Sequence, residues 1–460
     1  MQALKTRIFR LIIAIVLLLP LGAKAQTLHS SVSTYSPYSM YGMGELTTPG
    51  NAIQQSMGGI GVAMFSTTMA NMMNPAAFGY TPQQSFLFDF GIDGGHYRNN
   101  QEKYGTTTSK VKTAYNTINI HNIAFQMPLA KGLGLGFGLS PYSNVGYSMY
   151  NDDLSSSIAG NVGRVRYQYY GDGNITDVKA GIGWAPFRKL SLGAALVYYW
   201  GNIKRSYNAM VSDVITGSGE YSSTVGTDTY DVSKFKAQFG IMWNPLLDLK
   251  KERILTLGAT YDLGGPVEPN MTKYVYVDNI LTSTVREENE SSLPLRLPQQ
   301  ISGGIFYQTP KVRFGVDYVY QDWGSQNTDF IESGGRGVEV AYTDTHTIKA
   351  GFEIIPRRSD VSNYANRMSY RVGARYGDYY QTFGGCKVHQ YVVTAGVGLP
   401  VKLFGRSSVD LGFEYGHRDP ASQSIMVNDV KVGMIKQNYF KFSLGLSLFG
   451  ERWFYRYKYE

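Results

Sequence analysis

Three things are scarce in this 460-residue sequence: cysteine, charged residues and long apolar runs. The single cysteine, Cys386, excludes an internal disulfide framework and a cysteine-rich metal site. Charged residues make up only 17% of the chain, against about 25% in an ordinary soluble domain. Beyond the N-terminus, no apolar run approaches the roughly 18 residues that mark a membrane-spanning helix. The scarcities therefore disfavour a disulfide-stapled domain and a bundle of membrane helices.

The N-terminus has the three parts of a secretory signal peptide. Basic residues precede an apolar run from Leu11 to Leu21, and small residues follow at Ala23 and Ala25. The run is too short for a helix that crosses a bilayer, although an uncleaved anchor helix is the alternative. We expect residues 1–25 to be removed, which would lower the formal net charge from +8 to +4. The remaining charges are interspersed, so no basic stripe for nucleic acid remains.

Glycine and aromatic residues are abundant, with 52 glycines, 36 tyrosines and 14% aromatic residues in all. Segments of about ten residues alternate between apolar and polar side chains. In YFKFSLGLSLF, residues 439–449, one face carries Phe440 and Leu444, and the other carries Lys441 and Ser443. In an exported chain this repeated pattern predicts an all-β fold, a transmembrane antiparallel β-barrel. The barrel must close, because an open edge in lipid leaves backbone groups without partners.

Fourteen segments fit the pattern, and an even number is typical of bacterial single-chain barrels. They cover residues 85–97, 115–128, 131–140, 174–186, 190–207, 230–244, 252–263, 296–309, 311–323, 345–356, 370–380, 388–401, 408–419 and 438–449. Short connections such as 309–311 are typical of periplasmic turns, so we expect them at the periplasmic rim of the barrel. Long polar connections predict surface loops at 141–173, 208–229, 264–295, 324–344 and 420–437. A soluble β-sandwich or propeller is the alternative.

About sixty residues, 26–84, precede the first strand of the predicted barrel (85–449) and do not alternate. Their length suits a plug inside the lumen. The stretch SMGGIGVAMFSTTMANMMNPAAFGY, Ser56–Tyr80, resembles the N-terminal hatch of the FadL family of outer-membrane transporters for long-chain fatty acids and other hydrophobic compounds. A second patch, LPLRLPQQISGGIFYQTPKVRFGVDYVYQDW, residues 293–323, is also similar to that family.

The resemblance implies about 14 strands, an N-terminal plug, and passive uptake of hydrophobic small molecules through a kinked third strand. The hatch residues that it identifies are Met57, Gly58, Gly59, Gly61, Asn74 and Pro75. We interpret these glycines as sites of close backbone packing, because the pattern lacks the third glycine and the lysine of phosphate-binding loops. Candidate contacts for a hydrophobic ligand are Met64, Phe65, Met69, Met72 and Met73. Methionine suits pockets for varied apolar ligands, and packing of plug against wall is the alternative.

A possible lateral opening lies in KGLGLGFGLSPYSNVGY, residues 131–147. Glycines alternate with apolar residues up to Gly138, and Pro141 then cannot donate a ladder hydrogen bond. Either the strand is kinked there and the wall opens, or the strand simply ends.

Two features favour a different function, a non-transporting barrel subunit of an outer-membrane assembly or secretion complex. The chain continues past the last strand as an aromatic and basic tail, residues 450–460, which we expect at the periplasmic interface or on a partner subunit. The predicted inward face is also heavily charged, and we expect most of these groups to be solvated or ion-paired. They are Asp177, Lys179, Arg313, Asp317, Lys349, Glu353, Arg371, Arg375, Asp410, Glu414 and Lys441.

No constellation of residues predicts an enzyme. The six histidines have no metal-ligand spacing, and no Ser/His/Asp or paired-carboxylate arrangement stands out, although a Ser–His hydrolase at the rim is a third alternative. We therefore expect no catalytic residues, cofactor or metal. The expected partners are hydrophobic small molecules such as long-chain fatty acids, outer-membrane lipid, and other complex subunits through the tail or surface loops. The expected location is the outer membrane of a Gram-negative bacterium.

Overall fold

The computed structural model describes residues 34–104, 109–153, 164–212, 223–248, 250–277, 280–287, 295–324, 339–401, 407–427 and 430–450. The expected signal peptide, and the expected C-terminal tail beyond Gly450, lie outside these residues. Within the described part of the chain, no helix is both long enough and apolar enough to span a membrane.

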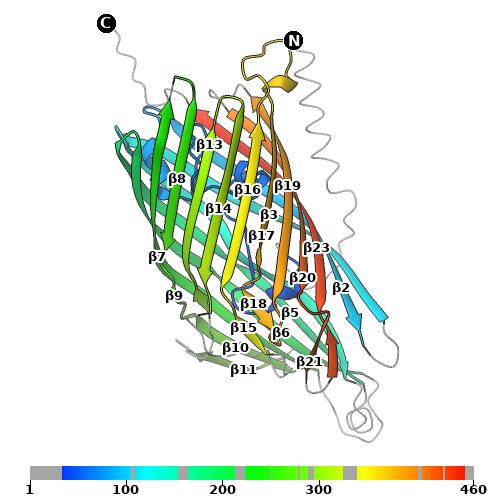
Figure 1. Cartoon of the computed structure of the whole chain (residues 1–460). Coiled ribbons are helices and arrows are strands. Elements are labelled where there is room, and N and C mark those ends of the chain that lie inside the picture. Colours follow the sequence, from blue (N-terminus) through cyan, green and yellow to red (C-terminus); the bar gives the residue numbers. More distant parts are fainter. Residues whose placement is uncertain are drawn as a thin grey trace, which may run out of the picture.

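Fourteen strands pair in sequence order into one closed antiparallel ring (Figure 1), because the last strand pairs with the first. The predicted closed barrel of fourteen strands is confirmed. The ring consists of β2 (Phe86–Lys103), β3 (Ser109–Ala130), β4 (Leu133–Asp153), β5 (Arg164–Phe187), β6 (Leu190–Ser212), β7 (Thr224–Asp248), β8 (Arg253–Asp262), β13 (Gln299–Gln308), β14 (Val312–Asp322), β16 (Thr345–Ile354), β17 (Ser369–Asp378), β19 (Val388–Val401), β20 (Ser407–Pro420) and β23 (Ile435–Gly450).

The predicted faces of the strands are also confirmed. On β23, Phe440 is 48% exposed on the outside, whereas Ser443 is buried inside. On β20, Phe413 is 54% exposed and Asp410 is buried. An apolar outer wall and a polar lumen are what a barrel in lipid requires.

The ring has one tall side and one short side. Strands β2 to β7 contain 18–25 residues, whereas β8, β13, β14, β16 and β17 contain 10 or 11. On the outer face of β6 the exposed apolar residues end at Trp200, and the next exposed side chains on that face are Asn202 and Lys204. On β7 they end at Phe235. The tall side therefore continues beyond the apolar band that faces lipid.

The prediction that residues 141–173 and 208–229 are loops was wrong for most of the first stretch and for about half of the second, because β4 to β7 extend into both. Their outer residues are polar above the apolar band, so the sequence there looks like a loop. The stretch 264–295 contains β9 (Gly265–Pro266) and the hairpin of β10 (Asn270–Val277) and β11 (Ile280–Glu287), and β10 pairs with β7. Further short strands are β12 (Arg296–Leu297), β15 (Val340–Tyr342), β18 (Gln381–Phe383), β21 (Ser424–Val427) and β22 (Val430–Gly433).

Residues 34–80, which precede β2, lie inside the ring (Figure 1). They contain η1 (Pro37–Met40), β1 (Glu45–Leu46), α2 (Ala52–Ser56) and η2 (Pro75–Tyr80). Asn51 and Gln54 form a capping box at the start of α2, and the Asn74 side chain caps η2 by accepting from the Ala76 N–H.

We call the end of the barrel with short connections such as 309–311 the turn end, and the opposite end the loop end. One further short helix, η3 (Ala365–Arg367), lies at the turn end.

Candidate functional site

The lumen holds two layers of chain. We call residues 51–80 the lower layer. They lie toward the turn end, which is uppermost in Figure 1, and there η2 packs against β4 to β7. The upper layer, residues 34–47, lies toward the loop end, where β1 pairs with β4. Both layers are mostly buried.

The lower layer is held through its backbone by polar side chains of the wall. Asp317 of β14 accepts hydrogen bonds from the N–H groups of Gly61, at 2.6 Å, and Val62, at 2.9 Å. Asp89 of β2 accepts one from the Ala70 N–H at 2.7 Å. Because these carboxylates satisfy backbone donors, the inward charges here have a structural use.

Close backbone contact explains two of the predicted hatch glycines. Gly58 has φ +74° and Gly59 has φ +81°, a region that favours glycine. Gly373 of β17 faces this turn, and a Cβ atom added there would lie 2.2 Å from the Gly58 nitrogen. The plug and the wall therefore both need glycine where they touch.

The candidate ligand residues fall into three groups. Met64 and Met69 pack with Met57 inside the lower layer and against Phe306. Phe65 packs against Tyr80, with ring centroids 4.9 Å apart. Met72 and Met73 line a cavity, as do Gly138 and Pro141. Only the last group is placed where a ligand in that cavity would touch it.

The upper layer is held mainly by apolar and aromatic packing. Met43 is completely buried and belongs to a cluster at the loop end that includes Trp323, Tyr342 and Tyr380. The rings of Trp323 and Tyr380 lie 4.4 Å apart. This cluster draws residues from β4, β5, β6 and β7 and from the connections around β15 and β18, so it fills the mouth of the barrel.

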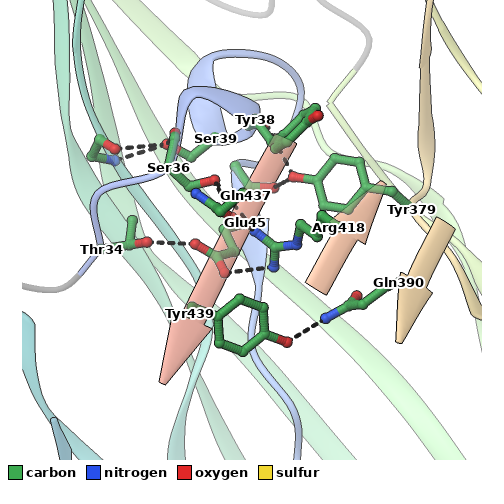
Figure 2. A network of polar contacts seen from close by, with 12 residues as sticks. Thr34, Ser36, Tyr38, Ser39, Glu45, Tyr379, Gln390, Arg418, Gln437 and Tyr439 are labelled. Atoms are coloured by element: carbon green, nitrogen blue, oxygen red, sulfur yellow. Dashed lines mark hydrogen bonds and ion pairs between the residues drawn. The ribbon is translucent and has the colours of Figure 1, made fainter. Parts of the chain in front are cut away.

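One buried polar network fixes the upper layer to β20 and β23 (Figure 2). Arg418 donates from Nη2 to Glu45 Oε1 at 2.6 Å and from Nη1 to Gln437 Oε1 at 2.5 Å. The Thr34 hydroxyl donates to the other Glu45 oxygen. Arg418 and Glu45 are 2% and 3% exposed, so each charge relies on the other for its neutralisation.

A cavity of about 260 Å³ separates the two layers. Leu46 and Tyr380 line its upper side, Gln54 and Met72 its lower side. Its wall is mixed, since it includes Ile123, Leu139, Asp177, Lys179, Asp262, Lys349 and Arg375. The volume is below the roughly 300–1,000 Å³ of common ligand pockets.

The cavity borders a seam between β3 and β4. These strands pair only from Ile123 with Leu139 to Ala130 with Leu133. Strand β4 does not end at Pro141 but runs on to Asp153, paired with β5 through a register shift between Pro141 and Ser143. The alternative that Pro141 ends the strand is therefore wrong, and the proline marks the level at which β3 and β4 part.

Several predicted inward charges form ion pairs across the lumen wall. Arg371 binds Glu353 and Asp410, both at 2.7 Å, and Arg375 binds Glu414 at 2.6 Å. Arg313 also pairs with Glu353, at 3.1 Å, so the expectation of ion-paired inward residues holds for six of them.

Sequence reasoning did not single out Arg418 or Glu45. They are 373 positions apart in the chain, and neither lies in a recognisable motif. One signal in the sequence could have identified Arg418. It lies two residues from Gly416 and four from Glu414, so the alternation of the strand places it on the same inward face.

The fold and the filled lumen define a plugged outer-membrane β-barrel. Solved structures of the same fold include a FadL homologue of Pseudomonas aeruginosa, at 14% identity and a TM-score of 0.57, covering 88% of this chain and 99% of that one. The toluene transporter TodX of P. putida is similar at 14% identity and a TM-score of 0.55, with the same coverage. The toluene transporter TbuX of Ralstonia pickettii is similar at 14% identity and a TM-score of 0.51, covering 87% of this chain and 98% of that one. The FadL resemblance seen in the sequence is thus confirmed as a shared fold.

The chain belongs to the BamG family, whose model matches residues 7–460. No curated protein matches it in sequence. Of the named structures of the same fold, TodX and TbuX are toluene transporters.

Proposed function

We propose that this chain is a sealed outer-membrane barrel that serves as a structural subunit of a larger outer-membrane protein assembly. The observation that carries the proposal is the double closure of the lumen, with an apolar cluster at the loop end and a hydrogen-bonded layer at the turn end. The cavity that separates them, as formed by the described residues, has a volume of about 260 Å³. A barrel closed in this way is suited to a scaffold rather than to an open channel.

The tall side supports a role in contacts with other proteins. Beyond the apolar band, its outer surface carries polar residues such as Asn202 and Lys204, together with Tyr150 of β4, which is 54% exposed. Tyrosine is enriched at protein interfaces because it combines apolar area with a hydrogen-bonding group. The β10–β11 hairpin enlarges the same surface.

The test is purification of the tagged full-length chain from native outer membranes in a mild detergent. We expect it to co-purify with other outer-membrane proteins in fixed stoichiometry. A tag on an unrelated abundant barrel from the same membranes is the control for carry-over. Recovery of the tagged chain alone, in several mild detergents, would contradict the proposal.

The second candidate function is passive passage of hydrophobic small molecules, such as long-chain fatty acids, between the cavity and the bilayer. The specific observation in its favour is that the cavity reaches the β3–β4 seam through Ile123, Leu139 and Pro141. Met72 and Met73 offer apolar contacts on the plug side. In this function Gly138 and Pro141 form the lateral opening.

Titration calorimetry with a long-chain fatty acid tests this second candidate. If the ligand binds in the cavity, we expect the replacement Met72→Gln to weaken binding. The replacement Met426→Gln, at a surface site that is 64% exposed, should leave binding unchanged. Absence of binding, together with unchanged fatty acid uptake in a deletion strain, rules it out.

A further inference from the structure

Among the strands that the structure describes, β3 has a neighbour on only one side over part of its length. It pairs with β2 from Ser109 to Gln126, but with β4 only from Ile123 onward. Among the described strands, none pairs with residues 109–118 on the side away from β2. Because successive N–H groups of a strand point to opposite sides, about half of those in this stretch face the open side.

The stretch is held in place from inside the barrel. The Tyr115 ring stacks on Tyr35 of the upper layer, with centroids 3.3 Å apart. Further along the same face, His121 contacts the Gly50 carbonyl and Gln55. These contacts fix β3 against the plug, so its open edge is a defined surface of the structure.

The open edge begins within the apolar band and rises above it. Ile118 is 63% exposed and lies opposite Gly94 of β2, which in turn lies opposite Phe442 of β23. At the outer end, Lys110 and Lys112 are exposed. Lysines on an edge discourage strand pairing, but residues 113–118 contain neither lysine nor proline.

The facing strand shows what such an edge binds. On β4, Asn144 and Ser143 pair with Glu45 and Leu46 of β1, and the Thr47 N–H donates to the Tyr142 carbonyl at 2.9 Å. The plug thus adds a short strand to β4. Lipid chains cannot replace such a strand on β3, because they offer no hydrogen-bonding groups.

We propose that residues 113–118 of β3 form an acceptor edge for an extended segment of a partner protein, which adds to the sheet as a further strand. The inference rests on the proposed role as an assembly subunit and names the surface that the partner uses. Strand addition gives affinity through backbone hydrogen bonds and specificity through alternate side chains. The partner segment is apolar on its lipid side near Ile118 and polar near Thr113.

Hydrogen exchange measured by mass spectrometry tests the acceptor edge. The full-length chain is compared alone in lipid nanodiscs and within the purified assembly. We expect about half of the amides in 113–118 to exchange quickly in the isolated chain and about tenfold or more slowly in the assembly. Residues 165–174 of β5, which pair with β4 and β6 on both sides, are the matched control and should not change. Slow exchange of 113–118 in the isolated chain, or equally fast exchange in the assembly, overturns the proposal.

A photocrosslinking amino acid in place of Ile118 identifies the added segment. We expect it to crosslink to one short extended segment of one partner, whereas the same amino acid in place of Phe413 should not. Phe413 is similarly exposed, at 54%, but lies on a strand that pairs on both sides. Crosslinks from both positions, or crosslinks scattered over many proteins, contradict strand addition.

If no assembly is recovered, the proposed function fails, but the edge can still be tested alone. The probe is then a synthetic peptide that copies residues 140–150 of β4, the next strand of the same sheet. Protection of residues 113–118 by this peptide supports an acceptor edge. Unchanged exchange at millimolar peptide, against the same β5 control, overturns it.

Discussion

The upper and lower layers of the plug fill the same lumen by different physical means. The lower layer is tied by wall carboxylates and by the Thr394 hydroxyl, which accept from its backbone, and by glycine where chains touch. The upper layer is tied by buried apolar and aromatic side chains and by one ion pair, Arg418–Glu45. The lower layer therefore depends on the strands at membrane level, and the upper layer on the strands and connections of the loop end.

Each layer is sensitive to a different kind of substitution. An apolar cluster loses stability when volume is removed, because the cavity left behind relaxes only in part. A backbone held by carboxylates loses stability when an acceptor is removed, because buried donors then lack partners. Substitutions in the two layers separate these two modes of attachment.

The largest effect is expected from Arg418→Ala, which leaves the Glu45 carboxylate buried without its cation. We expect a loss of about 3–5 kcal/mol in the free energy of unfolding, measured by urea titration in detergent, with protease cleavage within residues 34–47. Lys436→Ala is the control, since Lys436 pairs with Asp419 in a 40% exposed ion pair and should cost at most about 1 kcal/mol. Equal effects of the two variants would contradict the role of the network.

Truncation of Met43 to alanine tests the apolar cluster. Met43 is fully buried, so we expect a loss of about 2–5 kcal/mol in the free energy of unfolding. Met426→Ala, at a 64% exposed site, should change it by no more than about 0.5 kcal/mol. If Met43→Ala behaves like Met426→Ala, the loop-end cluster is not what holds the upper layer.

A smaller and more local effect is expected from Asp317→Asn in the lower layer. The neutral amide keeps one acceptor oxygen but loses the charge that two backbone donors bind, at a cost of about 1.5–3 kcal/mol. Hydrogen exchange at Gly61 and Val62 should accelerate while residues 34–47 stay unchanged. Asp172→Asn, at an exposed site, is the control. Equal acceleration in both layers would show that they open as one unit.

The smallest effect is expected at a turn that touches neither layer. The Asp360 carboxylate accepts hydrogen bonds from the Asn366 side chain at 2.7 Å, the Asn363 N–H at 2.9 Å and the Ser362 N–H at 3.0 Å, and these hold its pKa well below the ordinary value. Because the folded pKa is lowered, the stabilisation is complete above about pH 4 and is lost as the pH falls further. We expect exchange in residues 362–366 to be faster at about pH 3 than at about pH 6, after correction for intrinsic rates. The Asp360→Asn variant should lose this dependence, and a pH effect on either layer would contradict the separation.

The barrel could be predicted from the sequence because its signal is local. Alternation in segments such as 439–449 depends only on neighbouring residues, and the wall follows it strand by strand. The inward positions of Asp317 and Arg371 came from the same pattern. Only the extent of the strands was missed, since the outer faces of β4 to β7 become polar above the lipid.

The candidate site was harder because its contacts are not local. Glu45 meets Arg418, and Gly58 meets Gly373, only after the ring has closed. The methionines of the plug could be recognised as a group, but their division between internal packing and cavity lining depends on the tertiary fold. The open edge of β3 likewise follows from the register between strands, which composition does not encode.

Ion conductance in a planar bilayer tests the central claim, that the plug seals the barrel, most directly. The full-length chain, inserted at the single-molecule level, should give no conductance steps above the bilayer baseline. Removal of both layers, by deletion of residues 34–80, should give stable steps that show an inserted barrel. Persistent open-channel steps from the full-length chain would contradict the account.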